Sequence, residues 1–133
     1  MNIDEIVDNF GLFDDWEDRY RYLIDLGSHL APMPESLKTD ETKVRGCMSQ
    51  VWMVLGWKGG RLSLIADSDA QIVKGLIAVL ISIFQSKTKK EIEDIDVEAI
   101  FQKLGLNQHL SPNRRNGFFA MVERVRAFTA HGS

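Results

Sequence analysis

The chain contains one cysteine, Cys47, in the sequence KVRGCMSQVW (residues 43–52), between a proline-containing polar stretch and an apolar segment. A lone thiol can act as a nucleophile or carry a sulfur atom, but it cannot form an internal disulfide. It also supplies too few ligands for a thiolate metal site or an iron–sulfur cluster. The sequence therefore indicates a chemistry in which a single sulfur atom reacts or is carried.

The neighbours of Cys47 favour a reactive thiol. Gly46 permits close approach of another molecule to the backbone, and the positive charges of Lys43 and Arg45 favour the thiolate over the thiol. The alternative is a packing role, because a free cysteine is among the most often buried residue types. The residues favour reactivity and leave the packing role open.

Three other classes of thiol enzyme do not fit the spacing. A cysteine-dependent phosphatase needs an arginine six residues after its cysteine, where this chain has Met53, and glycines that aim backbone amides at phosphate. A papain-like protease needs a positioned histidine, and His29, His109 and His131 have no local signature. A dithiol oxidoreductase needs a second cysteine, which the sequence lacks.

Composition is typical of an ordinary globular domain. The 133 residues, 44% hydrophobic and 26% charged, predict a single domain over residues 1–133. A formal net charge of −3 argues against a nucleic-acid partner. The longest apolar run, residues 76–84, is too short for a membrane span, and the N-terminus lacks signal-peptide features. We therefore expect a cytoplasmic protein that needs neither nucleic acid nor membrane.

Apolar periodicity predicts helices on either side of a strand pair. Asp14 or Asp15 can cap a first helix that ends within residues 27–30, and Ser111 with Pro112 can open a last one. A shorter helix is expected over residues 97–104, ending at Gly105. Residues 31–45 are expected to form a long loop, of the kind that is often functional.

Two strands are expected over residues 51–57 and 61–67, joined at Gly59-Gly60 in a tight hairpin, with a weak third strand over residues 42–45. The first strand is almost entirely apolar, which predicts cover on both faces. Contiguous strands flanked by helices favour an α+β fold, with a small antiparallel sheet packed against helices.

A capping box is expected before the central helix. In the sequence SDAQ (residues 68–71), Ser68 can accept a hydrogen bond from the backbone of Gln71 while the Gln71 side chain returns one. The helix that follows carries apolar residues on nearly all sides from residue 72 to residue 84. Because so broad an apolar surface must be covered, this helix is predicted to lie at the centre of the core.

Several motifs together resemble the SufE family of sulfur-acceptor proteins. They are GCMSQVW (46–52), DSDA (67–70), VKGLIA (73–78) and QHLSPNR (108–114), with Trp16-Glu17, Tyr20, Leu26-Gly27, Gly117, Ala120-Met121 and Arg124. Their order and spacing match, so the resemblance spans nearly the whole chain. It implies the α+β fold that this family shares with cluster-scaffold proteins of the NifU and IscU type.

The resemblance implies that Cys47 accepts sulfur as a persulfide from a pyridoxal-phosphate cysteine desulfurase, activates that enzyme, and relays the sulfur toward iron–sulfur cluster assembly on a downstream scaffold. No cofactor or metal is expected in the chain itself, because no lysine marks a Schiff base and one cysteine cannot hold a cluster. The rival interpretation is a non-catalytic scaffold or regulatory binding module with a structural Cys47. Whether the protein is a monomer or a weak homodimer is left open.

The same resemblance implies residues that support the cysteine loop or recognise the partner: Gly46, Ser49, Gln50, Asp69, His109 and Arg114. Arg114 also stands out by itself, because the dipole of a helix disfavours a cation in its first turn. The local role of Asp69 is to place a carboxylate at the start of the central helix. For His109, a hydrogen bond within a helix linker is the commoner alternative to proton transfer.

Overall fold

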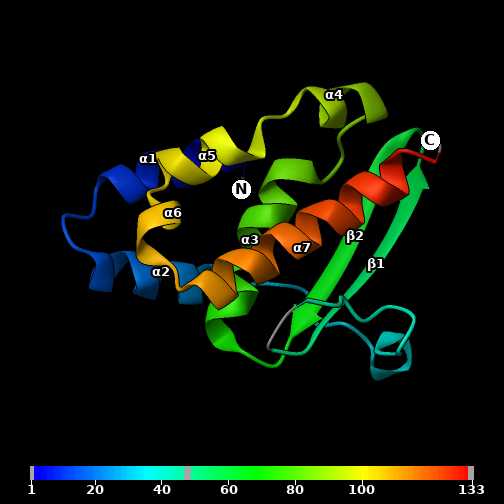
Figure 1. Ribbon diagram of the computed structural model, residues 1–133, viewed down its shortest axis with the longest axis horizontal. Coiled ribbons are helices and arrows are strands. Elements are labelled where there is room, and N and C mark those ends of the chain that lie inside the picture. Colours follow the sequence, from blue (N-terminus) through cyan, green and yellow to red (C-terminus); the bar gives the residue numbers. More distant parts are fainter. Residues whose placement is uncertain (1, 47–48, 132–133) are drawn as a thin grey trace.

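The computed structural model describes residues 2–46 and 49–131 (Figure 1). The elements, in chain order, are α1 (Ile3–Gly11), α2 (Trp16–Ser28), the 3₁₀ helix η1 (Glu35–Leu37), β1 (Val51–Lys58), β2 (Arg61–Ser68), α3 (Gln71–Phe84), α4 (Lys89–Asp94), α5 (Val97–Lys103), α6 (Leu106–His109) and α7 (Pro112–Thr129). The predicted α+β architecture, with a small antiparallel sheet among helices, is confirmed.

Three α-helices of the described chain were not predicted: α1, α4 and α6. The start of α1 has a recognisable signal, because the Asn2 side chain accepts a hydrogen bond from the Glu5 backbone at 3.0 Å, as an N-cap does. The apolar residues Ile6 and Phe10 then follow at helical spacing and are buried. Helix α4 begins with a capping box between Thr88 and Glu91.

The hairpin agrees with its prediction. Strands β1 and β2 pair antiparallel over their whole length, with Lys58 opposite Arg61, and Gly59 and Gly60 have φ of 60° and 77°. Two positive φ values at a two-residue turn match the right-handed twist of the strands. The weak third strand reduces to one bridge, between Lys43 and Trp52.

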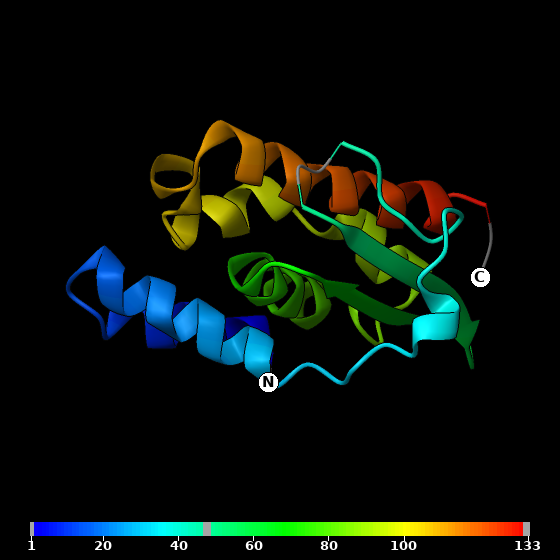
Figure 2. The same cartoon turned by 90° about the horizontal axis from the view of Figure 1, so that it is seen from below.

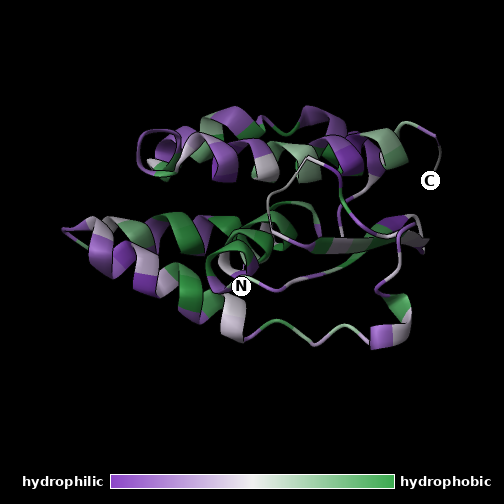
Figure 3. Ribbon diagram, turned by 60° about the horizontal axis from the view of Figure 1, so that its bottom comes forward, coloured by the Kyte–Doolittle hydropathy of each residue, from purple (hydrophilic) through white to green (hydrophobic). Residues whose placement is uncertain are grey.

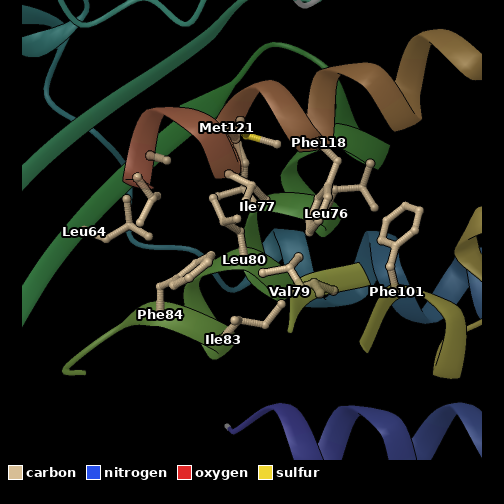
Figure 4. Packing of buried hydrophobic residues seen from close by; sticks show 14 of the residues in the cluster. Leu64, Leu76, Ile77, Val79, Leu80, Ile83, Phe84, Phe101, Phe118 and Met121 are labelled. Atoms are coloured by element: carbon tan, nitrogen blue, oxygen red, sulfur yellow. The ribbon is translucent and has the colours of Figure 1, made fainter. Parts of the chain in front are cut away.

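Helix α3 lies at the centre of the molecule. Figure 2 shows the α1–α2 pair on one side of α3 and α7 on the other, with the sheet continuing the middle layer. Hydrophobic colouring is concentrated in α3, as Figure 3 shows. In Figure 4 side chains of α3 meet residues of α5, α7 and β2, and the labelled residues include Leu76, Leu80, Phe101, Phe118 and Leu64. The prediction of a central buried helix is therefore confirmed.

Helices α2 and α3 touch backbone to backbone. A Cβ built on Gly75 would lie 2.3 Å from the Leu23 carbonyl oxygen, and one built on Gly27 would lie 2.6 Å from the Gly75 nitrogen. Real Cβ atoms do not approach other atoms so closely, so only glycine fits at these two positions. The close crossing fixes α3, and with it the start of α3 beside the end of β2.

Three local predictions were wrong. Asp69 precedes the N-cap of α3, whose first turn contains no acidic residue, and its carboxylate accepts from the Gln50 backbone instead. The N-cap of α3 is Ala70, with no side-chain cap, and Ser68 instead accepts from the Ala70 backbone at 3.2 Å. The apolar character of β1 does not mean full cover on both faces. Helices cover the face of Met53, whereas Val54 on the other face is only partly buried and its cross-strand neighbour Ile65 is 40% exposed.

Candidate functional site

The predicted sulfur acceptor Cys47 lies outside the described residues, as does Met48. The structure describes the chain on both sides of them, up to Gly46 and from Ser49 onward. These two ends fix where the segment starts and finishes. The candidate site is therefore built from its two ends and the surfaces beside them.

The end before the cysteine is held by α7 and by β1. The Val44 backbone donates to the Val51 carbonyl at 2.8 Å. The Arg124 guanidinium donates from Nη1 to the Lys43 carbonyl at 3.0 Å and from Nη2 to the Glu41 carbonyl at 2.6 Å. Bonds from a charged donor to two carbonyls are stronger than neutral ones, so one arginine fixes this end of the segment.

Gly46 adopts a backbone conformation that favours glycine. Its φ is +89°, in the left-handed region that residues with a side chain rarely adopt. It is exposed, and a Cβ built on it would lie 3.5 Å from the Ala120 side chain of α7. The glycine thus turns the chain at a position directly beside α7, one residue before the cysteine.

The end after the cysteine is held by the turn between β2 and α3. The Gln50 backbone N–H donates to Asp69 Oδ1 at 3.1 Å, and the Ser68 hydroxyl donates to the Gln50 carbonyl at 2.7 Å. The Asp69 backbone donates to the same carbonyl at 3.3 Å. Both polar groups of the Gln50 backbone are therefore paired, by two neighbouring residues of this turn.

A second carboxylate in this turn, that of Asp67, binds the long loop of residues 31–45. Asp67 is 8% exposed and accepts from the Ser68 backbone at 2.8 Å. Lys38 Nζ lies 3.3 Å from Asp67 Oδ2 and 5.2 Å from the centre of the Trp52 ring, and Lys74 Nζ lies 3.8 Å from Asp67 Oδ1. The hydrogen bond from Lys38 to Glu35, then its contact with Asp67, raises the pKa of Lys38. This contact closes the loop of residues 31–45 over β1.

A cavity of 320 Å³ opens between α3, α7 and the end of the cysteine segment. Its walls are apolar side chains from α3, β1 and α7, and its polar groups come from Ser49 and the first turns of α7. The lining residues are Ser49, Val51, Val73, Leu76, Ser111, Asn113, Arg114, Gly117, Phe118 and Met121. A small apolar chamber with a few polar groups is typical of a binding or reactive site, and this one is lined by Ser49, at the end of the segment that contains Cys47.

Arg114 is the one charged side chain among the described residues that line this cavity. It is exposed in the first turn of α7, its backbone donates to the Ser111 cap at 3.3 Å, and its side chain lines the cavity. Among residues 2–46 and 49–131 its guanidinium has no carboxylate within ion-pair distance. A cation at the positive end of a helix dipole is stabilised when an anion binds beside it.

His109 lies apart from the cavity. Its ring stacks on Trp16 of α2 with centroids 4.0 Å apart, and its carbonyl accepts from the Tyr20 hydroxyl. The ring is exposed and is not among the groups that line the cavity. The structure thus places Gly46, Ser49, Gln50 and Asp69 at the two ends of the cysteine segment, and Arg114 at the cavity. His109 lies elsewhere, at the junction of α2 and α6.

Arg124 and Ser68 are two residues that sequence reasoning did not assign to the site. Ser68 was assigned to a helix cap, because the pattern of residues 68–71 fits one. Arg124 contacts a backbone carbonyl 81 residues earlier in the chain. No local pattern signals such a contact, since the acceptor is a carbonyl that any residue provides.

The described part of the chain contains no group of three or more His, Cys, Asp or Glu side chains placed to hold a metal ion. None of its helices combines the length and apolar character needed to cross a membrane.

The chain is similar to known proteins over nearly its whole length. The family model of the SufE: Fe-S metabolism associated domain matches residues 4–129. An uncharacterized SufE-like protein of Rhizobium meliloti (strain 1021) is 46% identical over 130 residues, covering 95% of this chain and 93% of the relative. Another from Rhizobium etli is 45% identical over 129 residues, covering 94% and 87%.

One solved structure is similar in fold. It is the solution structure of a hypothetical protein from Thermus thermophilus, with a TM-score of 0.78 and 18% sequence identity, covering 97% of this chain and 93% of that one. At that identity the likeness concerns the fold alone.

Proposed function

The chain belongs to the SufE family, whose domain is associated with Fe–S metabolism, and from this premise we propose that it accepts sulfur on Cys47 from a cysteine desulfurase and activates that enzyme. The desulfurase brings the pyridoxal cofactor, and the sulfur continues to an iron–sulfur scaffold. This function includes a cytoplasmic location, where free thiols stay reduced.

The transfer is a displacement at sulfur. The Cys47 thiolate attacks the outer sulfur of a persulfide on the desulfurase cysteine, and a new S–S bond forms at Cys47. The old S–S bond breaks, and the desulfurase cysteine leaves as a thiolate. No net oxidation or reduction takes place, so the step needs no further reagent.

One observation supports the proposal above the others: the segment that contains Cys47 starts and finishes at two well-anchored ends beside a small apolar cavity. Arg124 holds the backbone before the cysteine, and Asp69 holds the backbone after it. Fixed ends with a short intervening stretch restrict where the thiol can go, which lowers the entropy cost of presenting it to a partner. A purely structural cysteine needs no such arrangement.

Positive charge near the segment suits the reaction. Arg45 and Arg114 both project from exposed positions, one beside the cysteine and the other at the cavity. Positive charges lower the pKa of a thiol and stabilise a thiolate or persulfide anion. Arg114 also serves in this proposal to recognise a negatively charged surface of the desulfurase.

Mass spectrometry tests the acceptor role. The protein is incubated with a cognate desulfurase and free cysteine, then weighed under non-reducing conditions. We expect a gain of one sulfur atom that dithiothreitol removes and that Cys47→Ser abolishes. No gain on the wild type would overturn the proposal and favour a binding module with a structural cysteine.

Charge reversal tests the role of Arg114. Arg114→Glu should lower stimulation of the desulfurase while the far-UV spectrum and Tm stay unchanged. Lys103→Glu, at an exposed lysine at the end of α5, is the matched control and should leave stimulation intact. Equal stimulation by both variants would remove Arg114 from the recognition surface.

A further inference from the structure

The two edges of the sheet differ in how they are covered. Along the outer edge of β2, the Leu62 backbone donates to the Lys87 carbonyl at 2.8 Å and accepts from the Ser86 backbone at 2.9 Å. The Gln85 side-chain amide then pairs with the Leu64 backbone as a strand would, accepting at 2.8 Å and donating at 3.0 Å. These contacts close the edge of β2 to other chains.

The outer edge of β1 accepts a strand at its start and is open beyond it. Residues 42–44 run antiparallel to the start of β1, and the Met53 N–H donates to the Thr42 carbonyl at 2.8 Å. Because backbone groups alternate in direction along a strand, the N–H and C=O groups of Leu55 and Trp57 also point away from β2. No described residue pairs with these four groups, so the row of hydrogen bonds begun by residues 42–44 stops short.

A groove of 360 Å³ lies beside this open stretch, between β1 and α7. Its lining is apolar except for one arginine: Met53, Leu55, Arg124, Ala127 and Phe128. Trp57, the next residue on this face of β1, stacks on Phe128 with ring centres 5.8 Å apart. In a strand added to β1, the side chains opposite Leu55 and Trp57 lie on the same face as the groove. Apolar side chains are therefore expected at these two positions of the added strand.

The other face of the open stretch has an empty position at Gly56. A Cβ built there meets nothing within 4 Å, and Ile65, diagonally across on β2, is 40% exposed. An aromatic side chain placed opposite a glycine at a sheet edge covers the exposed backbone. Lys58, two residues further on the same face, is exposed, and no described carboxylate lies within ion-pair distance of it. A strand that fits this face carries an aromatic residue opposite Gly56 and an acidic residue opposite Lys58.

Arg124 favours one direction for the added strand. Toward the start of β1, residues 42–44 already occupy the edge, so an added strand has to stop opposite Leu55. The Arg124 guanidinium lies at this boundary, where it donates to the Glu41 and Lys43 carbonyls and also lines the groove. A guanidinium has five N–H donors, and these two carbonyls take two of them. An antiparallel strand brings its carboxyl end to this cation, whereas a parallel strand brings its amino end.

From these observations we propose that the edge of β1 binds the C-terminal segment of a partner protein as an added antiparallel strand. In chain order the segment reads acidic, apolar, aromatic, apolar, and its terminal carboxylate binds Arg124. The acidic residue pairs with Lys58, the aromatic residue lies over Gly56, and the last apolar residue lies opposite Leu55. Strand addition at a sheet edge and capture of a chain end are recurring modes of peptide recognition. Figure 1 shows β1 as the outer strand of the pair, on the side away from α3.

This proposal is independent of the sulfur-acceptor function. The open stretch lies toward the hairpin turn, whereas the cysteine segment joins the other end of β1 at Val51. Binding is measured on Cys47→Ser, which cannot accept sulfur, and sulfur uptake is measured on the wild type. The failure of one proposal is therefore distinguishable from the failure of the other.

Calorimetric titration with synthetic peptides tests the chain end. The acetylated peptide Ser-Thr-Glu-Val-Phe-Val, with a free terminal carboxylate, should bind Cys47→Ser with a dissociation constant of about 0.1 mM. The same peptide as a C-terminal amide is the matched control. It should bind roughly 10-fold more weakly, because it lacks the charge that pairs with Arg124. Equal affinity of the acid and the amide, or no binding of the acid at millimolar concentration, would overturn the proposal.

Amide hydrogen exchange locates the bound strand. Saturation with the acid peptide should slow exchange at the Leu55 and Trp57 amides by about 10-fold or more, because each then donates to the peptide. A peptide N-methylated at both valines keeps the side chains and the carboxylate but cannot donate to the edge, and it should give no protection. Protection of other amides without these two would overturn the proposal. Protection that rises with the concentration of the protein alone would give the edge to a second copy and would overturn it too.

A charge swap tests the register. Lys58→Glu, in the Cys47→Ser background, should bind the glutamate peptide about 3-fold more weakly, and it should prefer a peptide with lysine in place of that glutamate. Lys103→Glu in the same background, at the exposed end of α5, is the matched control and should keep the original preference. The same preference in both variants would overturn the assigned pairing with Lys58.

Discussion

The two sides of α3 are built differently. On the α2 side, Gly27 and Gly75 bring two helix backbones into contact, and no side chain fits between them. On the α7 side, a cavity of 320 Å³ lies between α3 and α7, lined by Val73 and Leu76 of α3 and by Phe118 and Met121 of α7. One side of α3 is closely packed, and the other has a cavity that reaches Ser49, at the end of the cysteine segment.

The way the backbone is held also differs between the two sides. The α2 side depends on close packing, whereas the cysteine segment and the loop before it depend on a few polar contacts from Arg124, Asp69 and Lys38. Packing energy is spread over many atoms. Each of these polar contacts, which we call tethers, is lost when one side chain is replaced. This division predicts that substitutions on the α2 side damage the whole fold, and that substitutions of the tethers act locally.

The largest effect is expected from Gly75→Ala. The added methyl group would lie 2.3 Å from the Leu23 carbonyl oxygen, which is backbone and cannot rotate away. The helices must separate, so the free energy of unfolding should fall by about 3 kcal/mol. Urea denaturation measures the change. Gly11→Ala is the control, because a Cβ there meets nothing within 4 Å; equal stability of the two variants would contradict the close crossing.

Arg124→Met should rank second. It removes two charged hydrogen bonds to the Lys43 and Glu41 carbonyls while keeping an aliphatic side chain at this position of α7. We expect a loss of about 2 kcal/mol in urea denaturation and slower sulfur uptake by Cys47. Arg126→Met, whose side chain is 46% exposed beside Glu123, should change stability by less than about 0.5 kcal/mol. A smaller loss for Arg124 than for Arg126 would show that the first end of the segment is held in another way.

The sequence predicts the hairpin, the central helix and the last helix because each has a local signal. Gly59-Gly60 specifies the turn, the apolar surface of residues 72–84 requires burial, and Ser111 with Pro112 marks a helix start. The site is less predictable, because its tethers join positions that are far apart in sequence. The Ser68 hydroxyl shows the limit, since its local pattern fits a helix cap while its proton goes to the Gln50 carbonyl.

Asp69→Ala should have a smaller effect on stability, about 1 kcal/mol, because the bond that it loses is exposed. Its main result should be local: the Gln50 amide loses its acceptor, so hydrogen exchange at Gln50 should accelerate while exchange within α3 stays unchanged. Glu98→Ala, in the first turn of α5, is the control for removal of an exposed carboxylate. Unchanged exchange at Gln50 would mean that Ser68 alone holds this end.

The smallest effect should come from Lys38, and it should depend on pH. Contacts with Glu35 and Asp67 raise its pKa in the folded state above the ordinary value of 10.5. The protonated form of Lys38 therefore stabilises the folded state. This contribution is fully present below the unfolded pKa and disappears as the pH rises through the folded pKa. Lys38→Met should therefore be slightly less stable than the wild type at about pH 8 and equal to it at about pH 12. The control variant Lys103→Met should match the stability of the wild type at both pH values. If Lys38→Met is still less stable than the wild type at the higher pH, the contribution of Lys38 comes from its aliphatic chain on Trp52 instead of its charge.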